Sequence, residues 1–211
     1  MTPDATPLVM PAADPTAVDA AAGALSRGAI VGLPTETVYG LAVLPQPAPL
    51  AALIAAKGRS PDKGVALLID DLDQVARLVE LPGAARRLAA ACWPGALTLV
   101  LRLLPGVALP DEVTGGRPTL GVRLPDHPVP RALARRLGPI AVSSANRSGE
   151  ADARTAAELL SSVGPSLALV IDDGPVRGGV PSTVVAVAPD GALTILRAGA
   201  LDLATLERVA G

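Results

Sequence analysis

The chain has 211 residues and a net charge of −2, and half of its residues are hydrophobic although only 1% are aromatic. This composition predicts an aliphatic core in one large domain or two small ones, and the charge gives no global sign of nucleic-acid binding. A single cysteine, Cys92, excludes an intrachain disulfide, and together with a single histidine, His127, it argues strongly against a zinc site.

Residues 1–15 are rich in Pro, Ala and Asp, and we expect them to form a flexible N-terminal segment. They contain neither a basic segment nor an apolar run of signal-peptide length, and no stretch elsewhere approaches the ~20 apolar residues of a membrane span. We therefore expect a soluble cytoplasmic protein with no membrane partner. Neither a repeat nor a linker divides residues 16–211, which predicts a single domain there.

Helical and strand patterns alternate along this domain. Helices are predicted over 16–27, 49–56, 71–80, 83–92, 130–137, 155–163 and 201–209. Strands are predicted over 29–33, 65–69, 97–103, 119–124, 139–143 and 167–171, followed by a hairpin of 182–188 and 193–196 around the turn 189–191. This alternation predicts an α/β fold with some antiparallel pairing near the C-terminus.

The most informative segment is 34–40, Pro-Thr-Glu-Thr-Val-Tyr-Gly, which directly follows the predicted strand 29–33. Open α/β sheets bind ligands where their strands end, so polar groups displayed there are candidates for a site. The segment also carries Tyr39, the one tyrosine of a chain that has no phenylalanine. We predict that 34–40 is a binding loop.

Basic residues follow several of the predicted elements. Lys57 and Arg59 bracket a glycine, and Lys63 lies four residues further on. Arg123 interrupts one apolar strand pattern and Arg197 ends another, and a buried arginine needs an anionic partner. A ligand phosphate or carboxylate suits the guanidinium because either can bind it through two oxygens.

Each of these features has a structural alternative. The loop 57–64 could be a solvated surface loop, and 144–146 could be a helix-capping turn. Arg123 could pair with Glu36 or Asp126.

The acidic clusters and the lone cysteine favour structural interpretations. Asp70, Asp71 and Asp73 could bind a metal, but helix capping is the favoured interpretation. The segment 172–174 is interpreted as a turn, and Cys92 as a small core residue. Neither a GxxxxGK[ST] nor a GxGxxG run occurs, so a bound nucleotide would be held without those loops.

Seven stretches, in this order along the chain, resemble the YrdC-type threonylcarbamoyl-AMP synthase family. They are PTETVYGL at 34–41, KGRSPDKGVALLI at 57–69, WPGALTLVL at 93–101, PTLGVRLPDHP at 118–128, SSANRSG at 143–149, PSTVV at 181–185 and ILRAG at 195–199. The resemblance is to the short, single-domain form, because the chain ends where the longer form continues into a second domain. It implies a twisted, open sheet of mixed parallel and antiparallel strands with flanking helices, in a single catalytic domain at 16–211.

The resemblance also implies an activity, that of L-threonylcarbamoyladenylate synthase, a nucleotidyltransferase. Such an enzyme condenses L-threonine, bicarbonate and ATP into threonylcarbamoyl-AMP and pyrophosphate. Downstream threonylcarbamoyl-transferase proteins then modify adenosine 37 of tRNAs that read ANN codons, and tRNA itself is a further candidate partner. Mg²⁺ would be held mainly by the ATP phosphates, so no metal site of the protein's own is expected.

By motif position, the resemblance assigns roles to individual residues. The catalytic set would be Lys57, Arg59, Ser144 and Asn146. The threonine site would be Thr35, Arg123 and Ser182. ATP would contact Arg59, Lys63, Thr119, Ser144 and Arg197. Two positions depart from the pattern: Leu68 stands where some members have His, and Asp152 stands where others often have Ser.

Two other functions share parts of this pattern. An RNA-binding or ribosome-maturation module could use the same basic concave surface, and it would show salt-dependent RNA affinity without ATP turnover. A carbamoyl-adenylate enzyme of the hydrogenase-maturation kind also contains a YrdC-like domain, but in a far longer chain with acylphosphatase and zinc-finger segments. The length of 211 residues and the single cysteine argue against that enzyme.

Overall fold

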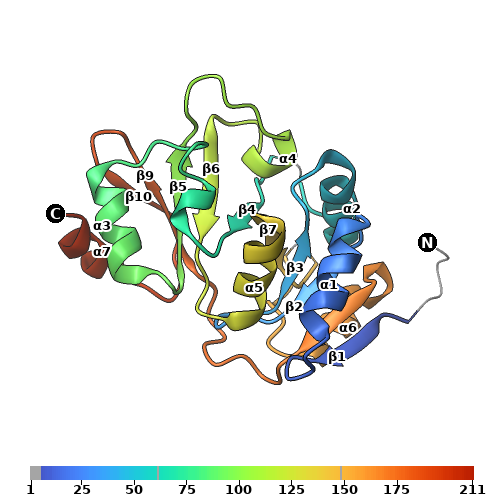
Figure 1. The fold of residues 1–211 in the computed structure, drawn as a ribbon. Coiled ribbons are helices and arrows are strands. Elements are labelled where there is room, and N and C mark those ends of the chain that lie inside the picture. Colours follow the sequence, from blue (N-terminus) through green and yellow to red (C-terminus); the bar gives the residue numbers. More distant parts are fainter. Residues whose placement is uncertain (1–5, 61, 148) are drawn as a thin grey trace.

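The computed structural model describes residues 6–60, 62–147 and 149–211, and within them ten strands form one sheet with seven α-helices around it (Figure 1). The strands are β1 Leu8–Pro11, β2 Val31–Leu33, β3 Gly40–Val43, β4 Ala66–Leu68, β5 Leu97–Arg102, β6 Thr119–Arg123, β7 Ile140–Ser144, β8 Leu169–Asp172, β9 Thr183–Val187 and β10 Leu193–Arg197. The α-helices are α1 Ala17–Ser26, α2 Pro47–Lys57, α3 Gly83–Cys92, α4 Asp111–Thr114, α5 Pro128–Leu137, α6 Ala156–Val163 and α7 Leu203–Ala210.

The sheet mixes parallel and antiparallel neighbours, which confirms the predicted α/β fold class. Its strand order is β1-β8-β2-β3-β7-β4-β6-β5-β9-β10. Strands β1 and β2 run parallel to β8, β4 runs parallel to β6, and β5 runs parallel to β9. The other neighbours are antiparallel, including the predicted C-terminal hairpin of β9 and β10.

The N-terminal segment is more ordered than its composition predicts. Leu8–Pro11 form the edge strand β1, which pairs with β8 over four register positions from Leu8↔Leu169 to Pro11↔Asp172. The prediction of a flexible segment over 1–15 is therefore wrong for this strand, because pairing with a distant strand orders it. Residues 1–5 lie outside the described residues.

The helix predicted over 71–80 is also wrong. A short 3₁₀ helix, Leu72–Gln74, forms there, capped by the Asp71 carboxylate and by the Gln74 side chain. Beyond it the backbone pairs with the end of β5, where Val79 forms an antiparallel bridge with Leu103. Turns continue the backbone to Val79, and at its end the Leu78 carbonyl and the Glu80 amide bond to Leu104 and Arg102 instead of continuing a helix. The sequence patterns also failed to indicate β3 and α4.

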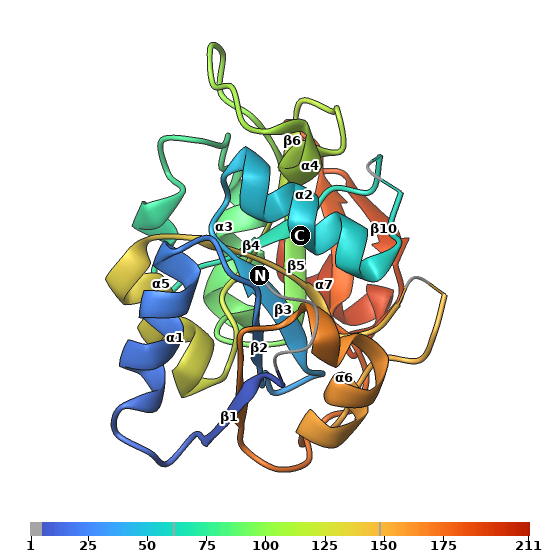
Figure 2. The ribbon, with the colours of Figure 1, turned by 90° about the vertical axis from the view of Figure 1, so that its right-hand side faces the viewer.

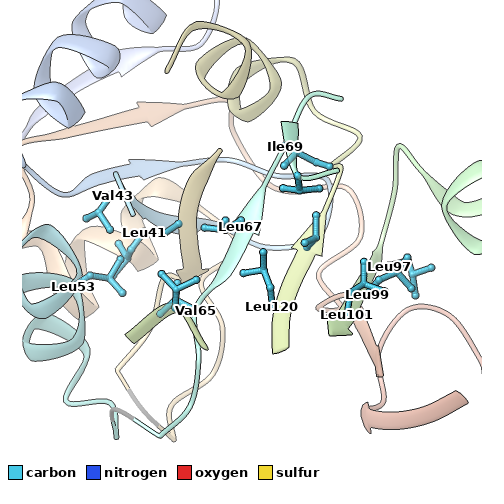
Figure 3. Packing of buried hydrophobic residues seen from close by; sticks show 14 of the residues in the cluster. Leu41, Val43, Leu53, Val65, Leu67, Ile69, Leu97, Leu99, Leu101 and Leu120 are labelled. Atoms are coloured by element: carbon cyan, nitrogen blue, oxygen red, sulfur yellow. The ribbon is translucent and has the colours of Figure 1, made fainter. Parts of the chain in front are cut away.

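Helices cover the two faces of the sheet unequally. Helices α2, α3, α6 and α7 pack on one face, and their side chains join a cluster that extends from β3 to β9. Figure 3 shows the middle of this cluster, from Leu41 and Val43 through Leu67 and Leu120 to Leu99. Helices α1 and α5 lie side by side on the other face, where they bury a cluster with β2, β3, β7, β8 and Leu68 of β4 (Figures 1 and 2).

The second face of β6, β5 and β9, and of β4 apart from Leu68, extends beyond α1 and α5. Side chains alternate between the faces of a strand, and Leu97, Leu99 and Leu101 of β5 all belong to the cluster on the first face. Thr98 and Val100 therefore point to the second face, where neither belongs to the cluster under α1 and α5. This uncovered part of the sheet is called the open face below.

Candidate active site

The floor of the open face consists of small side chains. By the same alternation, Ala66, Gly121, Val184 and Ala186 lie on this face together with Thr98, and all but Thr98 are partly exposed. A Cβ built on Gly121 would lie 3.4 Å from the Cβ of Ala66 and 3.8 Å from the methyl of Thr98. Because those are close to ordinary contact distances, packing does not require a glycine there. The missing side chain leaves room above the sheet.

Lys57, the last residue of α2, is buried, with 3% of its surface exposed. Its ammonium donates to the backbone carbonyls of Ser144 and of Asn146, the latter at 2.6 Å, and to the Asn146 side-chain oxygen at 3.1 Å. Three protons meet three oxygens, so Lys57 holds the loop that follows β7. The solvated-loop interpretation is therefore wrong for Lys57.

Ser144 and Asn146 are joined to each other in the same loop. The Ser144 hydroxyl donates to the Asn146 side-chain oxygen at 2.6 Å, and the Asn146 amide donates to the backbone carbonyl of Glu150 at 2.7 Å. The structure thus brings Lys57, Ser144 and Asn146 together, as the sequence predicts. Asn146 also shapes a turn, although not the helix-capping turn considered as the alternative, because Thr155 caps the next helix, α6.

Arg59 braces the charged loop against the same strand. Its Nε donates to the carbonyl of Lys63 and its Nη2 to the carbonyl of Gly64, both at 3.0 Å, while its Nη1 donates to the Ser143 hydroxyl at 3.4 Å. Lys63 is exposed, and its backbone carbonyl, not its ammonium, takes part in this bracing. The structure therefore places Arg59, but not the side chain of Lys63, against the loop after β7.

Arg123, the last residue of β6, pairs with the binding loop. Its Nη2 donates to the Glu36 carboxylate at 2.7 Å and to the Thr37 hydroxyl at 2.9 Å, and its Nε donates to the Gly95 carbonyl at 3.1 Å. The ion pair with Glu36 is one of the two structural alternatives considered for Arg123. It explains how a guanidinium at 7% exposure is accommodated in this structure.

The Thr35 hydroxyl supports Arg123 indirectly. It donates to the Val38 carbonyl at 2.6 Å, which uses its single proton. In the 2.9 Å contact between the two hydroxyls, Thr37 must therefore be the donor and Thr35 the acceptor. This leaves the lone pairs of the Thr37 oxygen for Arg123. Thr35 is thus an internal support of the predicted threonine site, and its hydroxyl faces the loop's own backbone.

A second segment holds the binding loop in place. The amides of Gly178 and Gly179 donate to the carbonyls of Glu36 and Thr37 at 3.0 and 2.8 Å. The Tyr39 hydroxyl lies 2.8 Å from the Gly174 carbonyl, and burial raises the pKa of Tyr39 to about 12. Tyr39 is therefore an anchor between two loops, which explains an aromatic residue in a polar segment.

Ser182 and Arg197 lie together at the far side of the open face. Arg197 Nη2 donates to the Ser182 carbonyl at 2.8 Å and to its hydroxyl at 3.1 Å. The Ser182 hydroxyl is also 2.8 Å from that of Thr98, on the floor. Thr119 begins β6 and lies on the same face as Arg123 at the other end of the strand, by alternation.

The cations of the site influence one another. Burial lowers the pKa of Lys57 from 10.5 to about 8; repulsion from Arg59 adds to this lowering and Asp152 opposes it. Burial and then repulsion from Arg197 lower the pKa of Arg59. Burial lowers the pKa of Arg197, where attraction to Asp152 opposes the shift and repulsion from Arg123 adds to it. Four positive groups therefore lie close enough to influence one another, and the carboxylates of Glu36 and Asp152 lie among them.

Several residues of the site were not predicted from sequence. No role was predicted for Thr98, Gly121 or Thr37. Asp152 was noted only as a departure from the family pattern. Alternation within the predicted strands 97–103 and 119–124 places Thr98 and Gly121 on the face of Arg123, so that signal was present in the sequence. The positions of Asp152 and Thr37 depend on loops, for which the sequence carries no comparable periodic signal.

The remaining candidates resolve as structural features. Asp70 accepts from Arg131 at 2.8 Å and from Arg135, so it is an ion-pair residue. Leu68, beside Arg123 in the β4–β6 register, is buried among apolar side chains. Within the described ranges no group of three or more His, Cys, Asp and Glu side chains is placed to hold a metal ion. No helix among the residues placed by the structure is both long and apolar enough to cross a membrane.

Comparison with known proteins assigns the chain to a family. The Sua5/YciO/YrdC family model, described as "Telomere recombination", matches residues 23–199, and the chain belongs to this family. The threonylcarbamoyl-AMP synthase of Bacillus subtilis is 39% identical over 201 residues, covering 94% of this chain and 57% of the relative. That of Chromohalobacter salexigens is 41% identical over 170 residues, covering 78% of this chain and 89% of the relative.

Solved structures agree with this assignment. Sua5 of Pyrococcus abyssi, in a crystal structure with L-threonine, matches with a TM-score of 0.85 and 36% identity, over 92% of this chain and 57% of that one. The chain therefore spans little more than half the length of this structure and of the Bacillus relative. YciO of E. coli, at 22% identity and a TM-score of 0.78, shares the fold.

Proposed function

We propose that this protein is an L-threonylcarbamoyladenylate synthase, a nucleotidyltransferase that condenses L-threonine, bicarbonate and ATP into threonylcarbamoyl-AMP and pyrophosphate. The observation that carries the proposal is a group of four neighbouring cations, Lys57, Arg59, Arg123 and Arg197, whose charges act on one another. Arg197 is tied to the open face through Ser182 and Thr98. The relatives named threonylcarbamoyl-AMP synthase support it. The catalytic domain would comprise residues 16–211, with β1 completing its sheet.

The chemistry explains why such a site is rich in cations. The threonine amine reacts with bicarbonate, releasing water and forming a carbamate. A carbamate oxygen then attacks the α-phosphorus of ATP, and the bond to the leaving pyrophosphate breaks. Carboxylate, carbamate and triphosphate must approach one another, and fixed positive charges offset their repulsion and stabilise the charge that develops on pyrophosphate. No side chain has to act as a nucleophile.

Each substrate has a proposed place on the open face. Arg123 and Ser182 would bind threonine, with Thr35 supporting Arg123 through Thr37. ATP would lie along Arg59, Lys63, Thr119, Ser144 and Arg197. The reacting groups would be held in position by Lys57, Arg59, Ser144 and Asn146.

Mg²⁺ would enter with ATP, bound by phosphate oxygens and water, because the site offers cations and no carboxylate cage. It would supply further charge neutralisation. The reaction would take place in the cytoplasm, and the product would pass to threonylcarbamoyl-transferase proteins that modify adenosine 37 of tRNA.

Pyrophosphate release tests the proposal. We expect release only when threonine, bicarbonate and ATP are all present, measured with each component omitted in turn. Equal release without threonine would remove the threonine assignment. RNA binding that weakens steeply with salt, in a protein that releases no pyrophosphate, would instead favour the RNA-binding alternative.

A further inference from the structure

The Glu36 carboxylate uses one of its two oxygens. Oε1 accepts from Arg123 at 2.7 Å. Oε2 is buried and has no hydrogen-bond partner among the residues that the structure describes. A buried carboxylate oxygen without a donor is costly, and native proteins nearly always satisfy such atoms. The Glu36 side chain as a whole keeps 15% of its surface exposed, so a bound molecule that reaches it would supply the missing donor.

Arg123 has the complementary capacity to donate. Both protons of Nη2 are used, by Glu36 and Thr37, and the Nε proton is used by Gly95. Nη1 takes part in none of the hydrogen bonds found in the described part of the chain. A cation with unused donors thus lies directly beside an anion with an unused acceptor.

A backbone hydrogen bond from a neighbouring segment holds Glu36 in place beside Arg123. The Glu36 carbonyl accepts from the Gly178 amide at 3.0 Å. A Cβ on Gly178 would lie only 2.9 Å from that carbonyl oxygen, so glycine permits this close approach. On the neighbouring strand β4, Leu68 is the residue paired with Arg123. Its side chain is apolar, so it offers Arg123 no acceptor that would compete with a bound ligand.

We infer that Glu36 is a substrate-binding residue whose Oε2 accepts from the α-ammonium of threonine, while Arg123 Nη1 donates to the threonine carboxylate. An α-amino acid carries both charged groups on one carbon, so it requires an anion and a cation side by side. This inference rests on the proposed function and adds the basis for recognising the amine. It also places the nitrogen that becomes the carbamate nitrogen next to Arg123.

The test compares two ligands that differ in the amine. L-Threonine and 3-hydroxybutanoate share the carboxylate and the 3-hydroxyl, but only threonine carries an ammonium. Calorimetric titration should show that Glu36→Gln weakens threonine binding by roughly 10-fold or more, the scale of a hydrogen bond to a charged group. Its affinity for 3-hydroxybutanoate should stay at the wild-type value. Glu36→Asp, which keeps the charge on a shorter side chain, should lose less affinity for threonine.

The controls separate this role from support of Arg123. Glu80→Gln removes one charge from an exposed pair with Arg102 and should change neither affinity. An equal loss for both ligands in Glu36→Gln would show that Glu36 only holds Arg123, and would overturn the inference. If Glu36→Gln does not fold, as judged by thermal melting, the selective loss must appear in Glu36→Asp or the inference fails. If the wild-type protein releases pyrophosphate with threonine, the proposed function stands whichever result Glu36→Gln gives.

Discussion

The two halves of the sheet carry different side chains on the face that α1 and α5 partly cover. On β2, β3 and β7 this face presents Val31, Leu33, Ala42 and Ile140, all fully buried. Beyond Leu68 of β4, which still belongs to the covered cluster, the same face of β4, β5, β6 and β9 presents Ala66, Thr98, Gly121 and Ala186. The alternation of the strands is the same in both halves, so the size and polarity of the side chains separate the core from the candidate site.

The comparison suggests that stability and activity reside in different halves. Apolar side chains beneath a helix contribute through burial, at about 25 cal/mol for each Å² removed from water. Small and polar side chains on an uncovered face contribute little burial and leave space for a ligand. Substitutions in one half should therefore change stability, and those in the other should change function.

The largest expected effect is in the covered half. Leu133 of α5 is fully buried against that face. Leu133→Ala should lower the free energy of unfolding by about 2–5 kcal/mol, because it leaves a cavity. Urea denaturation measures the loss, and pyrophosphate release per folded molecule should be unchanged. A fall in turnover without a fall in stability would break the division between the halves.

Arg59 provides the matching test in the open half. Arg59→Ala should reduce turnover by at least ~10²-fold, the scale of losing one electrostatic stabiliser. Stability should change little because its hydrogen bonds brace a loop at the surface. Arg59→Lys keeps the charge but loses the planar fork whose Nε and Nη2 reach the two carbonyls, and should fall between wild type and alanine. Wild-type turnover in a folded Arg59→Ala protein would return this loop to the solvated-surface interpretation.

A substitution at Gly121 tests whether the floor of the open face belongs to the core or to the candidate site. Its backbone is not in the left-handed region, and an added Cβ meets its neighbours at 3.4 Å or more. Gly121→Val should therefore fold with nearly wild-type stability while its methyls fill space above the floor. We expect the ATP KM to rise roughly 10-fold, the scale of modest overpacking. A large stability loss with an unchanged KM would mean that the floor is part of the core.

The sequence predicted the fold best where local pattern and long-range pairing agree. The buried strands and the helices with apolar faces were placed correctly, as in α6, which lies within the predicted range 155–163. The 71–80 segment and β1 were missed because their backbone groups pair with strands distant in the chain. Local patterns carry no information about such partners.

The sequence predicted which residues belong to the candidate site better than it predicted the contacts they make. The structure brings together Lys57, Arg59, Ser144 and Asn146, but all three protons of Lys57 and the side-chain oxygen of Asn146 are engaged with the protein's own groups. The Glu36 partner of Arg123 lies 87 residues away in sequence and was one of two alternatives. Which groups pair depends on loop geometry, which strand periodicity does not encode.

The last expected effect is a pH dependence of stability, and it concerns the charge on Lys57, which is buried although it belongs to the site. Its pKa is lowered from 10.5 to about 8, first by burial and then by repulsion from Arg59. Between pH 8 and 10.5 the unfolded chain holds a proton that the folded protein has lost, so unfolding takes up a proton. Raising the pH through that window should therefore stabilise the folded protein, by no more than about 1.4 kcal/mol per pH unit for one proton.

Lys57→Met isolates this contribution. Below pH 8 the wild type bears the full cost of a buried ammonium, and above it that cost is relieved. The free energy of unfolding of wild type, relative to Lys57→Met, should accordingly rise from pH 8 to 10 and stay level between pH 6 and 7. Lys63→Met, which removes an exposed lysine from the same loop, should keep the wild-type slope. A wild-type advantage that falls with pH would mean that the three oxygens around the ammonium outweigh its burial, and that Lys57 is held more firmly charged than water would hold it.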